Sequence, residues 1–301
     1  MERLDVIIRT RAEATRRHSL LRAIDSLMYQ RGIAVTPIVI VNGDRWDGCL
    51  VNQLQSMRAL RTYRIKGNLA EALLHGVASV AAAQFAFLDD DDEYLPDSLM
   101  AAVEMFLEAP DVDLVVTNGI VRYSNGAMRP AIDQPGKVRA DPLTALSTAN
   151  WLFNCGSLYR RTSFSPQWFS AVPTLFEWTW IAYKACLNKN IAFSKDFTYI
   201  YHDSDETLSK SDAMIEAEDA ALACIMHFDL PPNVRTVVRR KHSAALHAIS
   251  DHFRRRGEIG LALRYHWRSL LGPQGWRYLP YSRHLVTGVR LANWHGPRRG
   301  R

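Results

Sequence analysis

Four consecutive aspartates, residues 89–92, are the side chains in this sequence most able to do chemistry. They directly follow the apolar run 85–88 (FAFL), which predicts a buried strand with the aspartates at its exposed end. Carboxylates this close repel one another, so a folded protein keeps them together only with a counter-ion or full solvation. Carboxylate oxygens in such a position favour Mg²⁺ or Mn²⁺ bound together with a substrate phosphate.

A helix beginning near Pro96 offers a simpler explanation of the acidic run. Proline suits the first position of a helix, and carboxylates just before a helix interact favourably with its positive end. That explanation accounts for one or two carboxylates but not for four in a row, so the metal–phosphate site is the favoured interpretation.

The elements that would position these aspartates alternate along the first 120 residues. Buried, apolar runs predict strands at 4–8, 36–41, 63–65, 84–88 and 112–118. Helical spacing of apolar residues predicts helices at 18–29, 69–83 and 97–107. This alternation predicts an α/β fold with a mostly parallel central sheet and helices on both faces.

Ligands of such sheets bind outside the carboxyl ends of the strands. Three polar clusters fall at predicted strand ends: Arg9-Thr10-Arg11, Asn42-Gly43-Asp44 and the four aspartates. Their convergence on one edge is a stronger indication of a binding site than any cluster alone.

Composition places the chain among globular proteins. It has 301 residues with 48% hydrophobic content, and no apolar run approaches the roughly 20 residues that span a bilayer. The charged start, residues 1–5, lacks the apolar core of a signal peptide. The four cysteines (49, 155, 186 and 224) are far apart, which indicates reduced thiols rather than zinc ligands or disulfides. We therefore expect a cytoplasmic protein.

Charge is distributed unevenly about a net +6. From residue 231 onward the chain carries 15 Lys and Arg against only Asp251 and Glu258, a net +13, which leaves −7 for the rest. Amphipathic helices are expected there at 243–255 and 258–271. Two hypotheses stay open: the basic helices pack on the acidic body, or they contact an anionic membrane peripherally at its inner face. No nucleic-acid partner is expected, because no recognition module is visible.

The middle of the chain, 121–210, is rich in aromatic residues. Most should be core, but aromatic faces also stack on sugar rings. Trp151 and Trp178 are the candidates for acceptor binding.

The ordered motifs over residues 4–210 resemble the family-two glycosyltransferases of the GT-A fold. The specific match is 87–96 (FLDDDDEYLP), which is similar to that family's Leu-Asp-x-Asp-Asp motif with its following proline. Weaker matches occur in the same order as in the family: 5–10 (DVIIRT), 26–30 (SLMYQ), 39–44 (VIVNGD) and 67–76, which ends in Gly76.

The resemblance implies an inverting, metal-dependent transfer of a sugar from a nucleotide-sugar donor, with UDP-sugars favoured by family frequency. It implies that Asp91 or Asp92 holds Mn²⁺ or Mg²⁺, with His202 as a further ligand. Donor contacts then fall to Asp89 at the ribose, Asp90 beside it, Asn42 and Asp44 at the base and ribose, and Thr10. The family's Arg-Asn pair before the glycine is replaced by Leu73-Leu74, so Arg9, Arg11 or Lys66 must supply the basic diphosphate contact.

The segment that would supply the catalytic base departs from the family pattern. Relatives place a Glu-Asp pair at a helix start with the Asp as base, but here Trp178 occupies the Asp position. Glu177 is the nearest carboxylate and the candidate base, against the alternative that it only favours the helix start. Asp203 and Asp205 are further candidates.

The predicted organisation is a GT-A domain over 1–228 and a basic helical extension over 229–301. Residues 1–120 form its nucleotide-sugar half and 121–228 its acceptor half, for a sugar, lipid-linked or small-molecule acceptor. Two other functions remain open. One is a non-catalytic, metal-dependent carbohydrate-binding protein, which the missing Asp at 178 favours. The other is a sugar nucleotidyltransferase, although the loop after the first strand lacks the glycines that hold a triphosphate.

Overall fold

The computed structural model describes residues 1–203 and 212–285. The chain divides into two compact units, residues 1–207 and 208–301. Helix α8 (Asp212–Met226) belongs to the second unit, where it packs on α9 (Pro232–Arg255). The boundary that we predicted from the sequence, at residue 228, instead grouped α8 with the first unit. The sequence of α8 did not indicate that it packs on α9.

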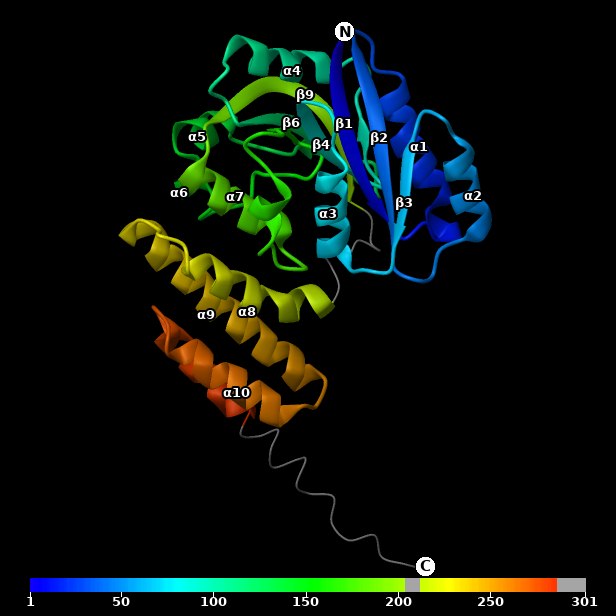
Figure 1. The fold of residues 1–301 in the computed structure, drawn as a ribbon. Coiled ribbons are helices and arrows are strands. Elements are labelled where there is room, and N and C mark those ends of the chain that lie inside the picture. The colour runs from blue at the N-terminus through cyan, green and yellow to red at the C-terminus, as the bar shows by residue number, and fades with distance from the viewer. Residues whose placement is uncertain (204–211, 286–301) are drawn as a thin grey trace, which may run out of the picture. The chain divides into compact units, whose positions relative to one another are not determined.

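One sheet organises the first unit (Figure 1). Its order is β3-β2-β1-β4-β8-β6-β9-β5, with β7 beside β6. The strands are β1 (Glu2–Thr10), β2 (Ile33–Asn42), β3 (Arg61–Ile65), β4 (Gln84–Asp89), β5 (Glu93–Tyr94), β6 (Leu114–Tyr123), β7 (Met128–Pro130), β8 (Ser157–Arg160) and β9 (Ile191–Asp203).

The long ladders of this sheet are parallel. β1 pairs in parallel with β2 and β4, β2 with β3, and β6 with β9. The antiparallel ladders are short and join β8 to β4 and β6, β5 to β9, and β7 to β6. The predicted α/β architecture with a mostly parallel sheet is confirmed, and so are the five strands expected in residues 4–118.

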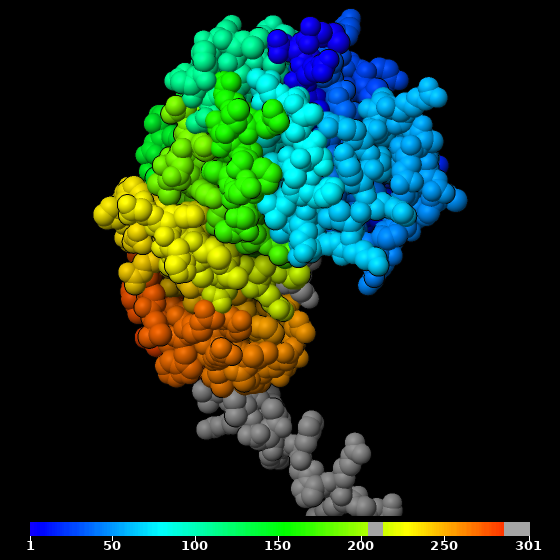
Figure 2. Space-filling model, viewed as in Figure 1, coloured from blue at the N-terminus to red at the C-terminus, as the bar shows by residue number. Residues whose placement is uncertain are grey.

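Helix α3 (Leu69–Ala78) packs on β1 and β2, and the cyan atoms of this part of the chain face the viewer in Figure 2. Helix α7 (Glu177–Asn188) lies on the same face, where the Trp178 ring meets the edge of Phe87 at 5.1 Å between centroids. The predicted helix 69–83 ends at Ala78, five residues early, because the strand that follows must begin at Gln84.

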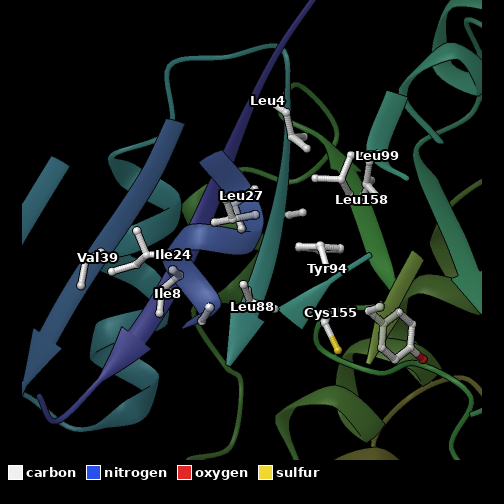
Figure 3. Packing of buried hydrophobic residues seen from close by; sticks show 14 of the residues in the cluster. Leu4, Ile8, Ile24, Leu27, Val39, Leu88, Tyr94, Leu99, Cys155 and Leu158 are labelled. Carbon is white, nitrogen blue, oxygen red and sulfur yellow. The ribbon is translucent and has the colours of Figure 1, made fainter. Parts of the chain in front are cut away.

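The opposite face of the sheet is covered by α1 (Arg17–Met28), α2 (Gly48–Ser56) and α4 (Leu99–Glu108), whose apolar residues form the largest described core cluster (Figure 3). Helix α2 was not predicted, and its start is fixed by Asp47, which accepts a hydrogen bond from the Leu50 backbone N–H. Short helices complete the unit: η1 (Ala14–Arg16), α5 (Pro135–Ala140), α6 (Pro142–Ala145) and η2 (Pro166–Phe169).

Alternation along β1 divides its side chains between the two faces. Leu4, Val6 and Ile8 join the cluster under α1, α2 and α4, whereas Ile7 points toward Gly76 of α3. Successive residues of a strand point to opposite faces. Arg9 therefore continues the α3 side of the strand and Thr10 continues the α1 side.

The second unit is helical. It contains α8, α9, α10 (Ile259–Leu270) and the 3₁₀ segment η4 (Gly275–Tyr281), around a small core of Ile249, Phe253, Ala262 and Leu285. The two predicted helices exist, although α9 begins earlier than expected, just after Pro231. No helix in the described part of the chain is long and apolar enough to cross a bilayer.

The contact between α3 and β1 depends on Gly76. A Cβ at this position would lie 2.5 Å from Cγ2 of the fully buried Ile7. We expect Gly76→Ala to lower the free energy of unfolding by about 1–3 kcal/mol in urea titrations, the usual range for overpacking. Gly48→Ala is the matched control, since no atom lies within 4 Å of its added Cβ. Equal stability of the two variants would contradict this packing.

Candidate active site

The polar residues at the carboxyl ends of the parallel strands meet at one edge of the sheet. In the β1–β4 register Arg9 lies opposite Asp89, and in the β2–β3 register Asn42 lies opposite Ile65, next to Lys66. The sequence prediction that these clusters share one edge therefore agrees with the strand pairing.

On the α3 and α7 side, Arg9 is the centre of a buried ionic group. Its guanidinium donates to Glu177 Oε1 at 2.9 Å and to the Leu69 carbonyl at 3.3 Å, and lies 3.9 Å from Asp89 Oδ1. The same guanidinium lies over the Trp178 ring, 5.4 Å from its centroid. One cation thus links a strand-end carboxylate to the carboxylate that begins α7.

On the α1 side, a second cation serves the next two aspartates. Arg16 Nη1 donates to Asp90 at 3.0 Å and to Asp91 at 2.7 Å. Asp90 also accepts a 2.6 Å hydrogen bond from the Thr10 hydroxyl. The alternation of β1 and β4 therefore sends Asp89 to Arg9 and Asp90 to Arg16.

Asp92 has a different environment from its neighbours. It is fully buried, and its oxygens accept hydrogen bonds from the His202 backbone N–H at 2.9 Å and the Cys155 thiol at 3.6 Å. We predicted Asp91 or Asp92 as the metal ligand. Because Asp92 is committed to holding β9 against the turn after β4, Asp91 is the better placed of the two.

His202 lies on β9, close to this turn. Its Nε2 is 2.9 Å from Glu93 Oε1, and burial lowers its pKa. As predicted metal ligand it would have to give up Glu93 or use its other ring nitrogen. Of the other base candidates, Asp203 ends β9, and Asp205 lies outside the described residues.

Negative charge exceeds the local positive charge at the end of β4. Partial burial, together with the neighbouring carboxylates, raises the pKa of Asp89 to about 7 although Arg9 opposes the change. Burial likewise raises the pKa of Asp90, and raises that of Asp92 well above its usual range. A bound cation would stabilise the ionised forms of all these carboxylates.

The residues present fit a Mg²⁺ or Mn²⁺ ion that is bound with a substrate. The described residues contain no group of three or more acidic, His or Cys side chains arranged to hold a metal ion. An ion held by one or two carboxylates and by diphosphate oxygens needs no such group. The side chains of Asp89 and Asp91 remain 34% and 29% exposed, so they can reach it.

The predicted base-binding residues lie at the ends of β2 and β3. Asn42 is 6% exposed and its Oδ1 is buried without a hydrogen-bond partner, which leaves an acceptor for a ligand N–H. Asp44 is exposed in the turn after β2. Lys66 is also exposed and lines an open hollow together with Glu71 and His75 of α3.

The two tryptophans predicted to bind an acceptor have different positions. Trp151 is 3% exposed, donates its indole N–H to the Pro142 carbonyl at 2.8 Å and packs on Phe193. It is therefore a core residue with no face open to an acceptor, which corrects our prediction. Trp178 is only partly buried and contacts Arg9, so it adjoins the candidate site.

Sequence reasoning missed Arg16 and Cys155. Arg16 follows the loop after β1, the same loop in which we considered only Arg9 and Arg11 as cations. The sequence offered a signal for Arg16, because it follows a strand end that we had already placed on the same edge as the aspartates. Cys155 gave no signal, because only the folded chain brings it to Asp92.

A family model described as glycosyl transferase family 2 matches residues 5–166, more than half of the chain. The chain belongs to glycosyl transferase family 2. The resemblance noted from the motifs is thereby confirmed, and the protein is a glycosyltransferase. No curated protein gives a significant match.

Solved structures with the same fold are glycosyltransferases of low sequence identity. S. aureus TarS 1-349 has a TM-score of 0.54 and 14% identity, with 99% of this chain and 93% of that chain covered. TarS 1-349 in complex with UDP-GlcNAc gives 0.57 and 13%, with 90% and 81% covered. The mannosyltransferase PcManGT from Pyrobaculum calidifontis, in complex with GDP-Man and Mn²⁺, gives 0.53 and 16%, with 97% and 81% covered. The likeness supports the GT-A fold of this glycosyltransferase.

Asp89 provides a test of the electrostatics of the metal-free enzyme. Because its pKa is raised to about 7 on folding, its ionisation costs stability from about pH 4 upward, and the full cost applies above about pH 7. We expect Asp89→Asn to raise Tm in EDTA, with the gain smallest near pH 4 and largest above pH 7.

Asp97→Asn is the control of opposite sign, because hydrogen bonds from Arg31 lower the pKa of Asp97. It should bring no gain at neutral pH. A loss of stability in Asp89→Asn above pH 7 would contradict the proposed excess of negative charge.

Proposed function

We propose that this glycosyltransferase moves a sugar from a nucleotide-sugar donor to an acceptor hydroxyl, with a divalent cation and with inversion at the anomeric carbon. The observation that carries the proposal is the pair of partly exposed carboxylates, Asp89 and Asp91, beside two cations, the buried Arg9 and the half-buried Arg16, at the carboxyl edge of the parallel strands. This is the edge where sheets of this kind bind ligands.

The donor's base and ribose are assigned to Asn42, Asp44 and Asp89, with UDP favoured over GDP. The orphan acceptor of Asn42 suits a base N–H, and unsatisfied buried acceptors are costly enough to require an explanation. TarS 1-349 has been solved with UDP and with UDP-GlcNAc, and PcManGT with GDP-Man. These complexes support a nucleotide-sugar donor, and experiment must decide whether its nucleobase is uracil or guanine.

The cation is assigned to Asp91, with Asp89 and His202 nearby, and Mn²⁺ and Mg²⁺ are both compatible with carboxylate ligands. When bound, it would neutralise the charge that develops on the departing diphosphate. Arg16 now holds Asp91, so donor binding must share or replace that ion pair. Thr10 keeps Asp90 in place through its hydroxyl. Lys66 forms no ion pair with another described residue, lies at the open end of β3 and supplies a second positive charge for phosphate.

Glu177 is the proposed base that takes the acceptor hydroxyl proton. Arg9 fixes the carboxylate in one orientation through the 2.9 Å hydrogen bond to Oε1, with Trp178 packed against the guanidinium. A positioned base must lie within hydrogen-bond reach of the hydroxyl that it deprotonates. Trp178 is the proposed acceptor contact, because its ring lies next to this carboxylate and can stack on a sugar face.

The acceptor is a sugar, a lipid-linked molecule or a small molecule carrying a hydroxyl. The basic second unit supports peripheral contact with an anionic membrane at its cytoplasmic face, which favours the lipid-linked class. No nucleic-acid partner is proposed.

Thermal shift with nucleotides tests donor and cation together. A ligand that binds only the folded protein stabilises it, by about 2.7 kcal/mol when its concentration is a hundred times Kd, and so raises Tm. We expect UDP and UDP-sugars to raise Tm strongly with Mn²⁺ and weakly in EDTA. Asp91→Asn should remove the Mn²⁺-dependent part, and Asp97→Asn should keep it. If no nucleotide produces a Mn²⁺-dependent shift, the metal-dependent donor site is wrong.

The role of Glu177 is tested by turnover of the donor that the thermal shift identifies. Glu177→Gln keeps the shape and the Arg9 contact but cannot accept a proton, so kcat should fall by about 10²–10⁴-fold with little change in KM. Arg9→Lys should keep measurable kcat and raise KM.

A Glu177→Gln variant with near-normal kcat but raised KM would make Glu177 a positioning residue for Arg9. Donor binding without hydrolysis or transfer by the wild-type protein would instead favour a non-catalytic carbohydrate-binding role.

A further inference from the structure

Exposed apolar side chains concentrate on α10 and the segment that follows it. Of the eleven large apolar side chains exposed in the described residues, five fall within 261–279. They are Leu261 (38% exposed), Trp267 (63%), Leu271 (84%), Trp276 (69%) and Leu279 (54%). Large apolar side chains scattered singly need no explanation, but a cluster rimmed by polar groups marks an interaction surface.

Helical spacing places part of this cluster on one stripe of α10. The stripe consists of four exposed residues spaced three or four positions apart: Gly260, Arg264, Trp267 and Leu271. The opposite stripe, Ala262, His266 and Ser269, is buried within the unit. The exposed stripe is therefore the outward face of α10, and Trp276 and Leu279 are exposed on η4, which packs on α10. We call Leu261, Trp267, Leu271, Trp276 and Leu279 the apolar face; residues around 260–280 are orange in Figure 2.

The charge of this region has one sign. From residue 259 to residue 301 the sequence contains eight arginines and no aspartate or glutamate. Arg264 lies on the exposed stripe and Arg277 on η4, both exposed, whereas Arg268 is ion-paired with Asp219 at 2.8 Å. Exposed guanidinium groups therefore border exposed Trp and Leu side chains.

We propose that the apolar face docks on an anionic lipid surface, with Trp267, Leu271 and Trp276 at the boundary of headgroups and acyl chains. A helix with a basic rim and Trp and Leu on its outer face lies in the plane of such an interface. Arginines close to anionic headgroups add attraction, at about 1 kcal/mol each. This inference rests on the proposed function in one respect: it selects a lipid-linked acceptor among the acceptor classes.

The chemistry of the face argues against other partners. A second copy docked through the same face would bring arginines against arginines, and residues 259–301 contain no aspartate or glutamate to pair with them. Single-stranded nucleic acid is bound by stacking on aromatic rings, which gives no role to the most exposed residue of the face, Leu271. Within the described residues, α9, with Arg239, Arg240 and Arg255, carries no exposed large apolar side chain of its own and would attract lipid by charge alone.

The test is co-sedimentation of the full-length protein with vesicles of phosphatidylcholine alone or mixed with phosphatidylglycerol. The docking variant is Trp267→Ser with Leu271→Ser and Trp276→Ser, three positions exposed enough to tolerate polar replacements. The matched control is Tyr29→Ser with Met128→Ser, which removes side chains of similar exposure, 73% and 61%, from the first unit. A charge variant, Arg264→Gln with Arg277→Gln, separates attraction from insertion.

We expect the wild type and the matched control to bind the phosphatidylglycerol vesicles and to bind phosphatidylcholine weakly. The docking variant should lose about tenfold or more in partitioning at every salt concentration, because apolar burial is not screened. The charge variant should lose about tenfold at low salt and little at high salt. Wild-type binding that survives unchanged in the docking variant, or no wild-type binding to either vesicle, would overturn the proposal.

Two further measurements exclude alternatives. Light scattering that changes from dimer to monomer in the docking variant would assign the face to a second copy and overturn the lipid assignment. Release of vesicle-bound protein by the docking mutations while Mn²⁺-dependent nucleotide binding stays intact supports it. If nucleotide binding is absent from the wild type as well, the proposed function fails while the docking result still stands.

Discussion

Repulsion among the carboxylates at the end of β4 is the constraint on which the site of the first unit depends. Four aspartates in succession fold together because several groups compensate them: Arg9 for Asp89, Thr10 and Arg16 for Asp90, the same Arg16 for Asp91, and the His202 backbone N–H for Asp92. Alternation in β1 supplies part of this separation, since it directs the successive side chains of Arg9 and Thr10 to opposite faces of the sheet. Burial, with the neighbouring carboxylates, raises the pKa of Asp89, so a further cation would stabilise its ionised form.

Local pattern predicted the elements that build this edge. The strands ending at Thr10, Asn42 and Asp89 are buried on both faces, so they read as continuous apolar runs, and parallel pairing then brings their ends together. Helix α2 escaped prediction because its nine residues contain only three buried side chains. The end of α3 was misplaced because alanine-rich sequence continues the helical pattern after the chain has turned.

The candidate site was predictable in its residue types and not in its pairings. Sequence placed the aspartates, Asn42 and Glu177 at the right ends of their elements, but partner choice depends on contacts between residues far apart in the chain. Arg9 meets Glu177 across 168 positions and Asp92 meets His202 across 110. Trp151 illustrates the same limit, because its burial depends on Phe193 and on the Pro142 carbonyl, which no local pattern announces.

The departure from the family pattern at the start of α7 and the orientation of Glu177 belong to one structural unit. Trp178 stands at the position where the resemblance to the family places a base aspartate, and its ring lies against the Arg9 guanidinium, which in turn holds Glu177. An aspartate at 178 would have placed a third carboxylate beside Asp89 and Glu177, with Arg9 alone to compensate. Replacing it by an aromatic ring keeps a cation–π contact for Arg9 and leaves a single carboxylate at the start of α7. Arg9, Glu177 and Trp178 are therefore best understood as one arrangement, in which the loss of the usual base and the orientation of Glu177 have a common physical cause.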